Sequence, residues 1–168
     1  SGVFRLGDEV TVLPSGFSSK IKSIDVAEGN IKEAFAPMSV SITLEDDIDI
    51  SRGDMIVRTN NKPNISQDVE VMLCWLHNDK AKPRSKYTIM HTSNEQKAMV
   101  KEIIYKININ TLERDINDKE LGMNDICKAK LRTTKPLMFD SYRDNRTTGS
   151  IILVDDTTNE TVAAGMII

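Results

Sequence analysis

Apolar and polar residues alternate over short stretches of this chain. Residues 39–44 place an apolar side chain at every second position with hydroxyl side chains between them, which is the period of a strand that buries one face. An acidic loop, residues 45–49, separates this stretch from the next apolar run, residues 55–57. No stretch of more than about two turns carries the 3.6-residue period of a helix. The pattern predicts an all-β protein.

The same pattern predicts strands on both sides of a polar segment that contains Pro63. Before this segment the expected strands are residues 9–13, 18–26, 39–44 and 55–57, separated by turns. After it they are residues 67–77, 87–91, 97–108, 127–139, 150–154 and 162–168, with a long connection at 111–126. The dense apolar character of the strand at 67–77 predicts burial on both of its faces. We therefore expect two small β-barrels, one in residues 1–62 and one in residues 63–168.

Composition limits the classes of function. The chain has 168 residues, a net charge of −3 and a pI near 5.5, which disfavour a nucleic-acid-binding surface because such surfaces are normally basic. No run approaches the roughly 18 apolar residues of a membrane span, so we expect neither nucleic acid nor membrane as a partner. Cys74 and Cys127 lie in apolar runs and are predicted to be buried free thiols, which is typical of a reducing compartment. The expected location is cytoplasmic.

Charge is unevenly distributed along the chain. Residues 78–106 contain seven basic and three acidic side chains, whereas residues 1–60 contain six basic and ten acidic ones. Two interpretations are open: solvated faces of opposite sign, or a basic surface that docks an acidic protein. Tyr and Arg are the types enriched at interface hot spots, and they guide the choice of candidates. The candidate protein-interface residues are Arg84, Lys86, Tyr142, Arg143 and Arg146.

No other set of residues predicts a catalytic, cofactor-binding or metal site. Cys74 and His77 are three residues apart, and such positions face opposite sides of a strand, so we expect packing residues rather than a nucleophile–base pair. Two His and two Cys, scattered along the chain, do not make a structural zinc site. The acids Asp46, Asp47 and Asp49 lack the rest of a calcium-loop pattern and are expected to be solvated.

Three short motifs also have a structural explanation. Residues 52–54 spell the adhesion tripeptide Arg-Gly-Asp, but between two strands they predict a turn. Residues 61–64 begin like a guanine-reading motif and end in Asn rather than Asp, and the chain has no GxxxxGK[ST] loop to cradle phosphates. Trp75, the only tryptophan, is expected in a core. The chain therefore carries no motif for binding a nucleotide.

Longer motifs resemble a known family. They are DIDISRGD at 47–54, IIYKININTLE at 103–113, KPLMFDSY at 135–142, NRTTGSIILVDD at 145–156 and VAAGMI at 162–167. Over essentially its whole length the chain resembles the C-terminal part of the GTPase subunit of sulfate adenylyltransferase, within the translation-factor superfamily of GTPases. One departure is Pro83-Arg84, where the family usually has Pro-Gly. A type II turn needs a positive φ at the position of the Gly, so Arg84 puts such a turn in doubt here.

The resemblance implies a fold and a function. It implies barrels similar to domains 2 and 3 of elongation factor Tu, the first being incomplete because the family's barrel begins upstream of the residues matching Ser1-Gly2. It implies a non-catalytic part of a regulatory subunit that helps a catalytic subunit form adenylyl sulfate and pyrophosphate from ATP and sulfate, coupled to GTP hydrolysis. GTP and Mg²⁺ would bind the family's upstream GTPase domain, so no cofactor is expected in this chain. The expected partners are the catalytic subunit and that GTPase domain.

Two alternatives stay open. One is a pair of barrels from a translation GTPase that binds tRNA or the ribosome, since fold does not determine function, although the acidic balance opposes it. The other is a free-standing scaffold module. An incomplete first barrel would expose backbone N–H and C=O groups along its strand edges, which predicts edge-to-edge self-association of the chain.

The missing phosphate loop leads to a prediction about nucleotide binding. We expect GTP to leave the melting temperature of the purified chain unchanged, whereas a ligand at about 100 times its dissociation constant stabilises a protein by roughly 2.7 kcal/mol. Differential scanning fluorimetry with GTP and a non-hydrolysable analogue, with ATP as the control, measures this shift. A saturable shift with GTP would place a nucleotide site within this chain.

Overall fold

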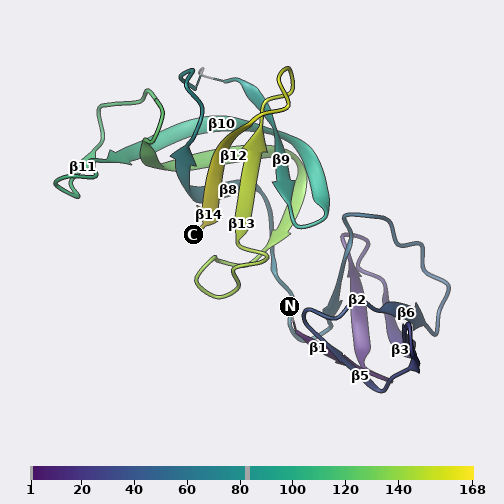
Figure 1. The fold of residues 1–168 in the computed structure, drawn as a ribbon. Helices are drawn as coiled ribbons and strands as arrows, with labels where there is room; N and C mark the ends of the chain where they lie inside the picture. The colour runs from purple at the N-terminus through teal and green to yellow at the C-terminus, as the bar shows by residue number, and fades with distance from the viewer. Residues whose placement is uncertain (1, 82–83) are drawn as a thin grey trace. The chain divides into compact units, whose positions relative to one another are not determined.

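The computed structural model describes residues 2–81 and 84–168 (Figure 1). The chain divides after Pro63 into two compact units, which are described separately: unit 1 is residues 1–63 and unit 2 is residues 64–168. The described residues form β-strands and no helix, so the prediction of an all-β protein is confirmed. No helix within the described ranges is long and apolar enough to cross a membrane.

Seven strands lie within the described residues of each unit. In unit 1 they are β1 (Val3–Arg5), β2 (Glu9–Leu13), β3 (Ser18–Val26), β4 (Gly29–Asn30), β5 (Glu33–Phe35), β6 (Ser41–Leu44) and β7 (Met55–Arg58). In unit 2 they are β8 (Asn64–Trp75), β9 (Lys86–His91), β10 (Asn94–Ile107), β11 (Arg114–Asp115), β12 (Ile126–Phe139), β13 (Ser150–Val154) and β14 (Thr161–Ile167). The longest strands, β8, β10 and β12, all belong to unit 2.

Six strands of unit 2 close into a barrel. Their hydrogen-bonded order is β10, β12, β8, β14, β13 and β9, and β9 pairs back onto β10. All six pairings are antiparallel, and β10 takes part in two of them, with β12 over residues 98–107 and with β9 over residues 94–99. The two-residue β11 pairs with the far end of β10 and lies outside the ring. A closed ring leaves no strand edge unpaired.

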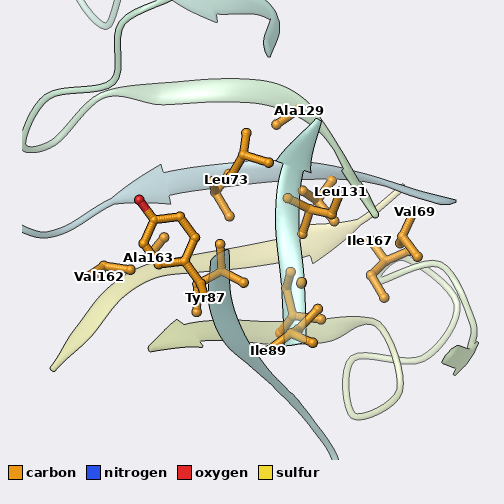
Figure 2. Packing of buried hydrophobic residues seen from close by; sticks show 14 of the residues in the cluster. Val69, Leu73, Tyr87, Ile89, Ala129, Leu131, Val162, Ala163 and Ile167 are labelled. Atoms are coloured by element: carbon orange, nitrogen blue, oxygen red, sulfur yellow. The ribbon is translucent and has the colours of Figure 1, made fainter. Parts of the chain in front are cut away.

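The hydrophobic core of unit 2 fills the interior of this ring. Figure 2 shows Leu73, Leu131 and Tyr87 among the side chains that enter the core from different strands. Trp75, at the end of β8, is 2% exposed, lies edge-on to the Tyr87 ring at 5.6 Å between ring centres, and donates from Nε1 to the carbonyl oxygen of Asp79 at 2.8 Å. The prediction that Trp75 is a core residue is confirmed. Burial of this apolar area is the main favourable term in the stability of the unit.

Unit 1 is the smaller arrangement of strands. β2 pairs with β3 and β7, β3 also pairs with β4 and β6, and β1 and β5 form a separate two-stranded sheet. Its core is built around Val10, Ile21, Ile24 and Ala34. Within residues 2–63, β7 pairs only with β2 and β6 pairs only with β3, so each keeps one unpaired edge.

The alternation of apolar and polar residues predicted the exact bounds of several strands. The expected strands at 9–13, 18–26 and 150–154 coincide with β2, β3 and β13. The expectation of burial on both faces for 67–77 is wrong, because β8 has one face inside the barrel and its buried positions alternate with half-buried ones. β1 and β5 were not expected, and each has only three residues. A strand of three residues is too short to show a period.

The difference in strand closure between the two units predicts a difference in backbone protection. Amides at unpaired edges exchange readily, whereas ring strands must open before they exchange. We expect the strands of unit 1 to exchange faster than the ring strands of unit 2, measured by hydrogen–deuterium exchange with mass spectrometry. We also expect light scattering to show concentration-dependent self-association. A strict monomer with equal protection in residues 9–57 and 67–168 contradicts this prediction.

Candidate protein interface

The five candidate interface residues separate into two clusters. Arg84 and Lys86 lie at the start of β9, and Tyr142, Arg143 and Arg146 lie in the loop between β12 and β13. Figure 1 shows this loop at the opposite end of the barrel from the start of β9. The five residues therefore do not form one continuous patch, and their role in binding a protein stays a prediction.

Arg84 lies in a turn immediately before β9. Its φ is +61°, in the left-handed region that side chains with a Cβ seldom adopt. The residue thus takes the positive φ that was in doubt from the sequence, although Pro83, the other half of that motif, lies outside the described residues. The side chains of Arg84 and Lys86 are exposed. Both are available for contact from solvent.

The loop between β12 and β13, here called the arginine loop (residues 140–149), is held by its own polar groups. The carboxylate of Asp140 accepts hydrogen bonds from Thr148 Oγ1 at 2.7 Å and from Asn145 Nδ2 at 3.3 Å. The backbone N–H of Gly149 donates to the carbonyl oxygen of Asn145 at 2.8 Å. Because the loop satisfies these groups internally, it has a defined conformation.

Three hydrogen bonds attach the arginine loop to the barrel. The N–H of Tyr142 donates to the carbonyl oxygen of Ile167 at 2.8 Å. The N–H of Ile167 donates to the carbonyl oxygen of Gly149, also at 2.8 Å. The Nε2 of His91, a buried side chain at the end of β9, donates to the carbonyl oxygen of Thr148 at 2.7 Å. A carbonyl oxygen only accepts, so Nε2 carries the proton in this bond. The loop is therefore fixed to both β14 and β9.

The arginine loop carries two cations without an acid partner in the described chain. The guanidinium of Arg146 lies 6.0 Å from the centre of the Tyr142 ring, at the outer limit of a cation–π contact. Arg143 is exposed. Neither arginine forms an ion pair with any residue in the described ranges. An aromatic ring beside unpaired guanidinium groups is the composition typical of protein contact sites.

The basic excess of residues 78–106 is largely neutralised by acids from other parts of the barrel. Lys97 Nζ lies 2.7 Å from Asp156, and Lys101 Nζ lies 3.5 Å from Asp68. The hydrogen bond from Lys97 lowers the pKa of the Asp156 carboxyl. Counting charge along the sequence missed these partners because they come from other strands and loops.

Lys106 is the least exposed of these paired lysines. Its Nζ lies 2.7 Å from Asp118 and 2.7 Å from Asp125. Burial disfavours the charge of Lys106, but its hydrogen bonds to the two carboxylates outweigh burial and raise its pKa, while the bond to Lys106 lowers the pKa of Asp118. Lys80 pairs in the same way with Glu120 at 2.5 Å. Much of the local charge is therefore used in structural ion pairs.

The two cysteines differ in exposure. Cys127 is buried in the barrel core, and burial raises the pKa of its thiol to about 12. The prediction of a buried thiol is wrong for Cys74, which is half-buried because it occupies an outward position of β8. His77 is not a packing residue either: its Nδ1 accepts from the N–H of Asp79 at 3.1 Å and its Nε2 lies 3.1 Å from the carboxylate of Glu160. The pair is not a nucleophile and its base.

No group of three metal-ligating side chains comes together in residues 2–81 and 84–168. Of the acids at the rim of unit 1, Asp46 accepts a hydrogen bond from Ser19 Oγ at 2.8 Å, and the neighbouring Asp47 and Asp49 are exposed. Arg52 and Gly53 lie in a turn, as the sequence predicted.

An exposed apolar group at the projecting end of β10 was not expected from the sequence. Ile109, Leu112 and Ile116 are 62%, 77% and 64% exposed. The turn that carries them is ordered, because the Asn108 side chain accepts a hydrogen bond from the N–H of Asn110 at 2.9 Å. Their only signal in the sequence is the presence of large apolar residues within a polar connection.

Comparison with known proteins gives consistent results. Residues 68–168 match the family model described as GTP-eEF1A C-terminal domain-like. The bifunctional enzyme CysN/CysC of Mycobacterium tuberculosis (strain ATCC 25618 / H37Rv) is 47% identical over 169 residues, which cover 100% of this chain and 28% of that protein. Sulfate adenylyltransferase subunit 1 of Sulfurovum sp. (strain NBC37-1) is 45% identical over 176 residues, which cover 100% of this chain and 36% of that protein. The chain thus spans about a third of the length of the curated relatives it matches.

Solved structures share the fold. A crystal structure of sup35 complexed with GDP has a TM-score of 0.88, with 17% sequence identity, and the match covers 100% of this chain and 41% of that one. The structure of sup35 complexed with GMPPNP has the same TM-score of 0.88 and the same 17% identity. At this level of identity the likeness shows the fold alone.

The close packing of Gly149 against the arginine loop predicts the effect of adding a methyl group there. A Cβ at Gly149 would lie 2.3 Å from the Tyr142 Cα and 2.5 Å from the Tyr142 N, both backbone atoms. We expect Gly149→Ala to destabilise the protein by about 1–3 kcal/mol, because the loop must move off β14. Urea unfolding followed by circular dichroism measures the change.

Gly122 provides the matched control for this substitution. A Cβ there meets only Asp125 Oδ2 at 3.6 Å, an ordinary contact. We expect Gly122→Ala to leave the stability unchanged or to raise it by about 0.4–1 kcal/mol through the unfolded state. Equal midpoints for the two variants would show that the arginine loop does not depend on the approach of Gly149.

Proposed function

Residues 68–168 belong to the GTP-eEF1A C-terminal domain-like family, and from this premise we propose that the chain is the β-barrel part of the GTP-hydrolysing regulatory subunit of a sulfate adenylyltransferase. The observation that carries the proposal is sequence identity over the whole chain. Proteins named sulfate adenylyltransferase subunit 1 or CysN/CysC align with 100% of it at 40–47% identity. Identity at this level over both units supports a shared function, whereas the likeness to sup35 supports only a shared fold.

In this proposal the chain contributes binding and rigidity rather than chemistry. The catalytic subunit would form adenylyl sulfate and pyrophosphate from ATP and sulfate, and GTP with Mg²⁺ would bind in a GTPase domain of the same subunit. The absence of phosphate-cradling and guanine-reading motifs from the sequence supports this division. The expected location is the cytoplasm, where ATP and GTP are available.

A rigid body is what such a regulatory subunit needs from its barrels. In switch proteins the nucleotide state biases a two-state arrangement of domains, and the change is passed on only if the parts that move remain stiff. Unit 2 is closed on itself, and its core is filled by buried side chains from all six ring strands. It is suited to serve as the body against which the nucleotide domain acts and on which the catalytic subunit docks.

The alternative of translation barrels that bind tRNA is not favoured by the surface. Nucleic-acid affinity depends on cations that replace the counterions of phosphates. The net charge of the chain is −3, and Lys80, Lys97, Lys101 and Lys106 are already paired with carboxylates. These four lysines are therefore not free to replace the counterions of phosphates.

The proposed function predicts a GTP-dependent reaction in a reconstituted complex. The complete subunit that carries this chain is combined with the catalytic subunit, and adenylyl sulfate formation from ATP and sulfate is measured. We expect GTP to raise the yield and GDP to leave it unchanged. Salt-dependent tRNA binding by the same subunit, together with no effect of GTP on adenylyl sulfate formation, would contradict the proposal and support the translation alternative.

A further inference from the structure

Outward positions of a barrel strand face water and are normally polar. β12 follows this rule, since Lys128, Lys130 and Arg132 alternate with the buried residues of the strand. Lys128 pairs with Glu70 at 2.9 Å, and Arg132 pairs with Asp68 at 2.5 Å. The other side of the ring, formed by β8, β14, β13 and β9, has a different composition.

Seven outward side chains on these four strands are apolar, in contrast to the charged row on β12. These residues alternate with the core residues of the same strands and are half-buried or exposed. They are Met72 and Cys74 on β8, Ala164 and Met166 on β14, Ile152 and Val154 on β13, and Met90 on β9. We call this set the methionine face. None of its members carries a charge.

The register of the strands makes the methionine face continuous. Cys74 lies opposite Ala164, Ala164 lies opposite Ile152, and Ile152 lies opposite Met90. Directly opposed residues on one face of an antiparallel pair have Cβ atoms about 4.5–5.5 Å apart. This row alone crosses all four strands without interruption by a polar residue. Figure 1 shows two of these strands, β13 and β14, side by side.

The methionine face is open to solvent at its largest side chains. Met166 is 44% exposed and Met90 is 40% exposed, and Met72 lies directly opposite Met166. Methionine side chains are flexible and polarizable, so they adapt to the shape of a partner. A continuous exposed apolar area of this kind typically marks a site of protein–protein contact.

The arginine loop borders this face. Ser150, opposite Met166 in the register of β13 and β14, donates from Oγ to the carbonyl oxygen of Arg146 at 2.5 Å. The N–H of Tyr142 is bonded to Ile167, the residue after Met166. The backbone of the loop that carries Tyr142, Arg143 and Arg146 therefore adjoins the apolar area at Met166.

We propose that the methionine face is the surface on which the catalytic subunit of the adenylyltransferase docks, and that this partner presents an apolar centre with carboxylates where it meets the arginine loop. The inference rests on the proposed function. Charge complementarity supports this occupant, because Arg143 and Arg146 find no carboxylate in the described chain and would pair with one across an interface. Removal of the apolar centre from water supplies the favourable free energy of docking. A nucleic acid is not the occupant, since its phosphates would meet seven uncharged side chains.

Substitutions in the face test this assignment. In the complete regulatory subunit, Met166→Glu and Met90→Glu each place a charge within the apolar area. We expect each to weaken binding of the catalytic subunit about thirtyfold or more, the usual effect of losing an interface hot spot. Isothermal titration calorimetry measures the affinity, and circular dichroism melting verifies that each variant is folded.

The matched control is Leu112→Glu. Leu112 is an exposed apolar residue in the turn between β10 and β11, outside the methionine face, and the substitution introduces the same charge. We expect this variant to bind the catalytic subunit as the wild type does. Equal weakening by Leu112→Glu, or wild-type affinity in both face variants, would overturn the docking surface and leave the proposed function intact.

Two other results would decide against the proposal in different ways. If the wild-type subunit binds no catalytic subunit, the proposed function fails and the docking surface falls with it. If Met166→Glu dissolves a dimer of the regulatory subunit, seen by sedimentation velocity, without changing the affinity for the catalytic subunit, the occupant is a second copy of the chain. That result overturns the proposal as well.

Cys74 gives an independent readout without any substitution. It lies half-buried within the methionine face, whereas Cys127 is buried and the pKa of its thiol is raised to about 12, so a maleimide at neutral pH reacts with Cys74 first. We expect the catalytic subunit to slow the alkylation of Cys74, measured by peptide mass mapping. An unchanged rate in the assembled complex would contradict docking on this face.

Discussion

The pairing of β9 with β10 is the interaction on which the rest of unit 2 depends. β10 is long enough to pair with β12 along residues 98–107 and with β9 along residues 94–99. Its register with β12 shifts twice, between Val100 and Glu102 and between Ile103 and Tyr105, and such irregularities let a strand bend. The bend brings the start of β10 against β9 and closes the ring. Without this pairing both strands would present an unpaired edge.

Closure also decides which side chains face water. Each ring strand has one inward and one outward set, and a shift of one residue would exchange the two sets. The inward set is mostly apolar, and it holds Cys127 and Trp75 in the core. The outward set is not uniform: on β12 it includes ion-paired Lys128 and Arg132, whereas on β14 and β13 it includes the apolar Met166 and Ile152. Since the inner face is already buried, the apolar part of the outer face is not needed to fold the barrel. It is therefore a feature of the surface rather than of the core.

Much of the fold could be predicted from the sequence, because alternation with a period of two is visible wherever a strand is long enough. β2, β3 and β13 were located to the residue on this basis. Alternation does not show which strands are neighbours, however. For this reason the carboxylate partners of Lys106 were missed, and the outward position of Cys74 was not distinguished from a buried one. The residues of the arginine loop were selected by type, but only the register of β13 and β14 reveals the apolar area beside them.

A surface built on ring strands differs physically from one built on loops. Loops lose conformational entropy when a partner orders them, whereas the backbone of the methionine face is already fixed by interstrand pairing, so less free energy is lost on docking. Methionine side chains retain adaptability on this fixed backbone. The neighbouring arginine loop is itself attached to β14 and β9 by backbone and histidine hydrogen bonds, so the backbone of this loop is fixed beside these strands. A fixed backbone combined with adaptable side chains would favour one orientation of the partner in the docking that we propose.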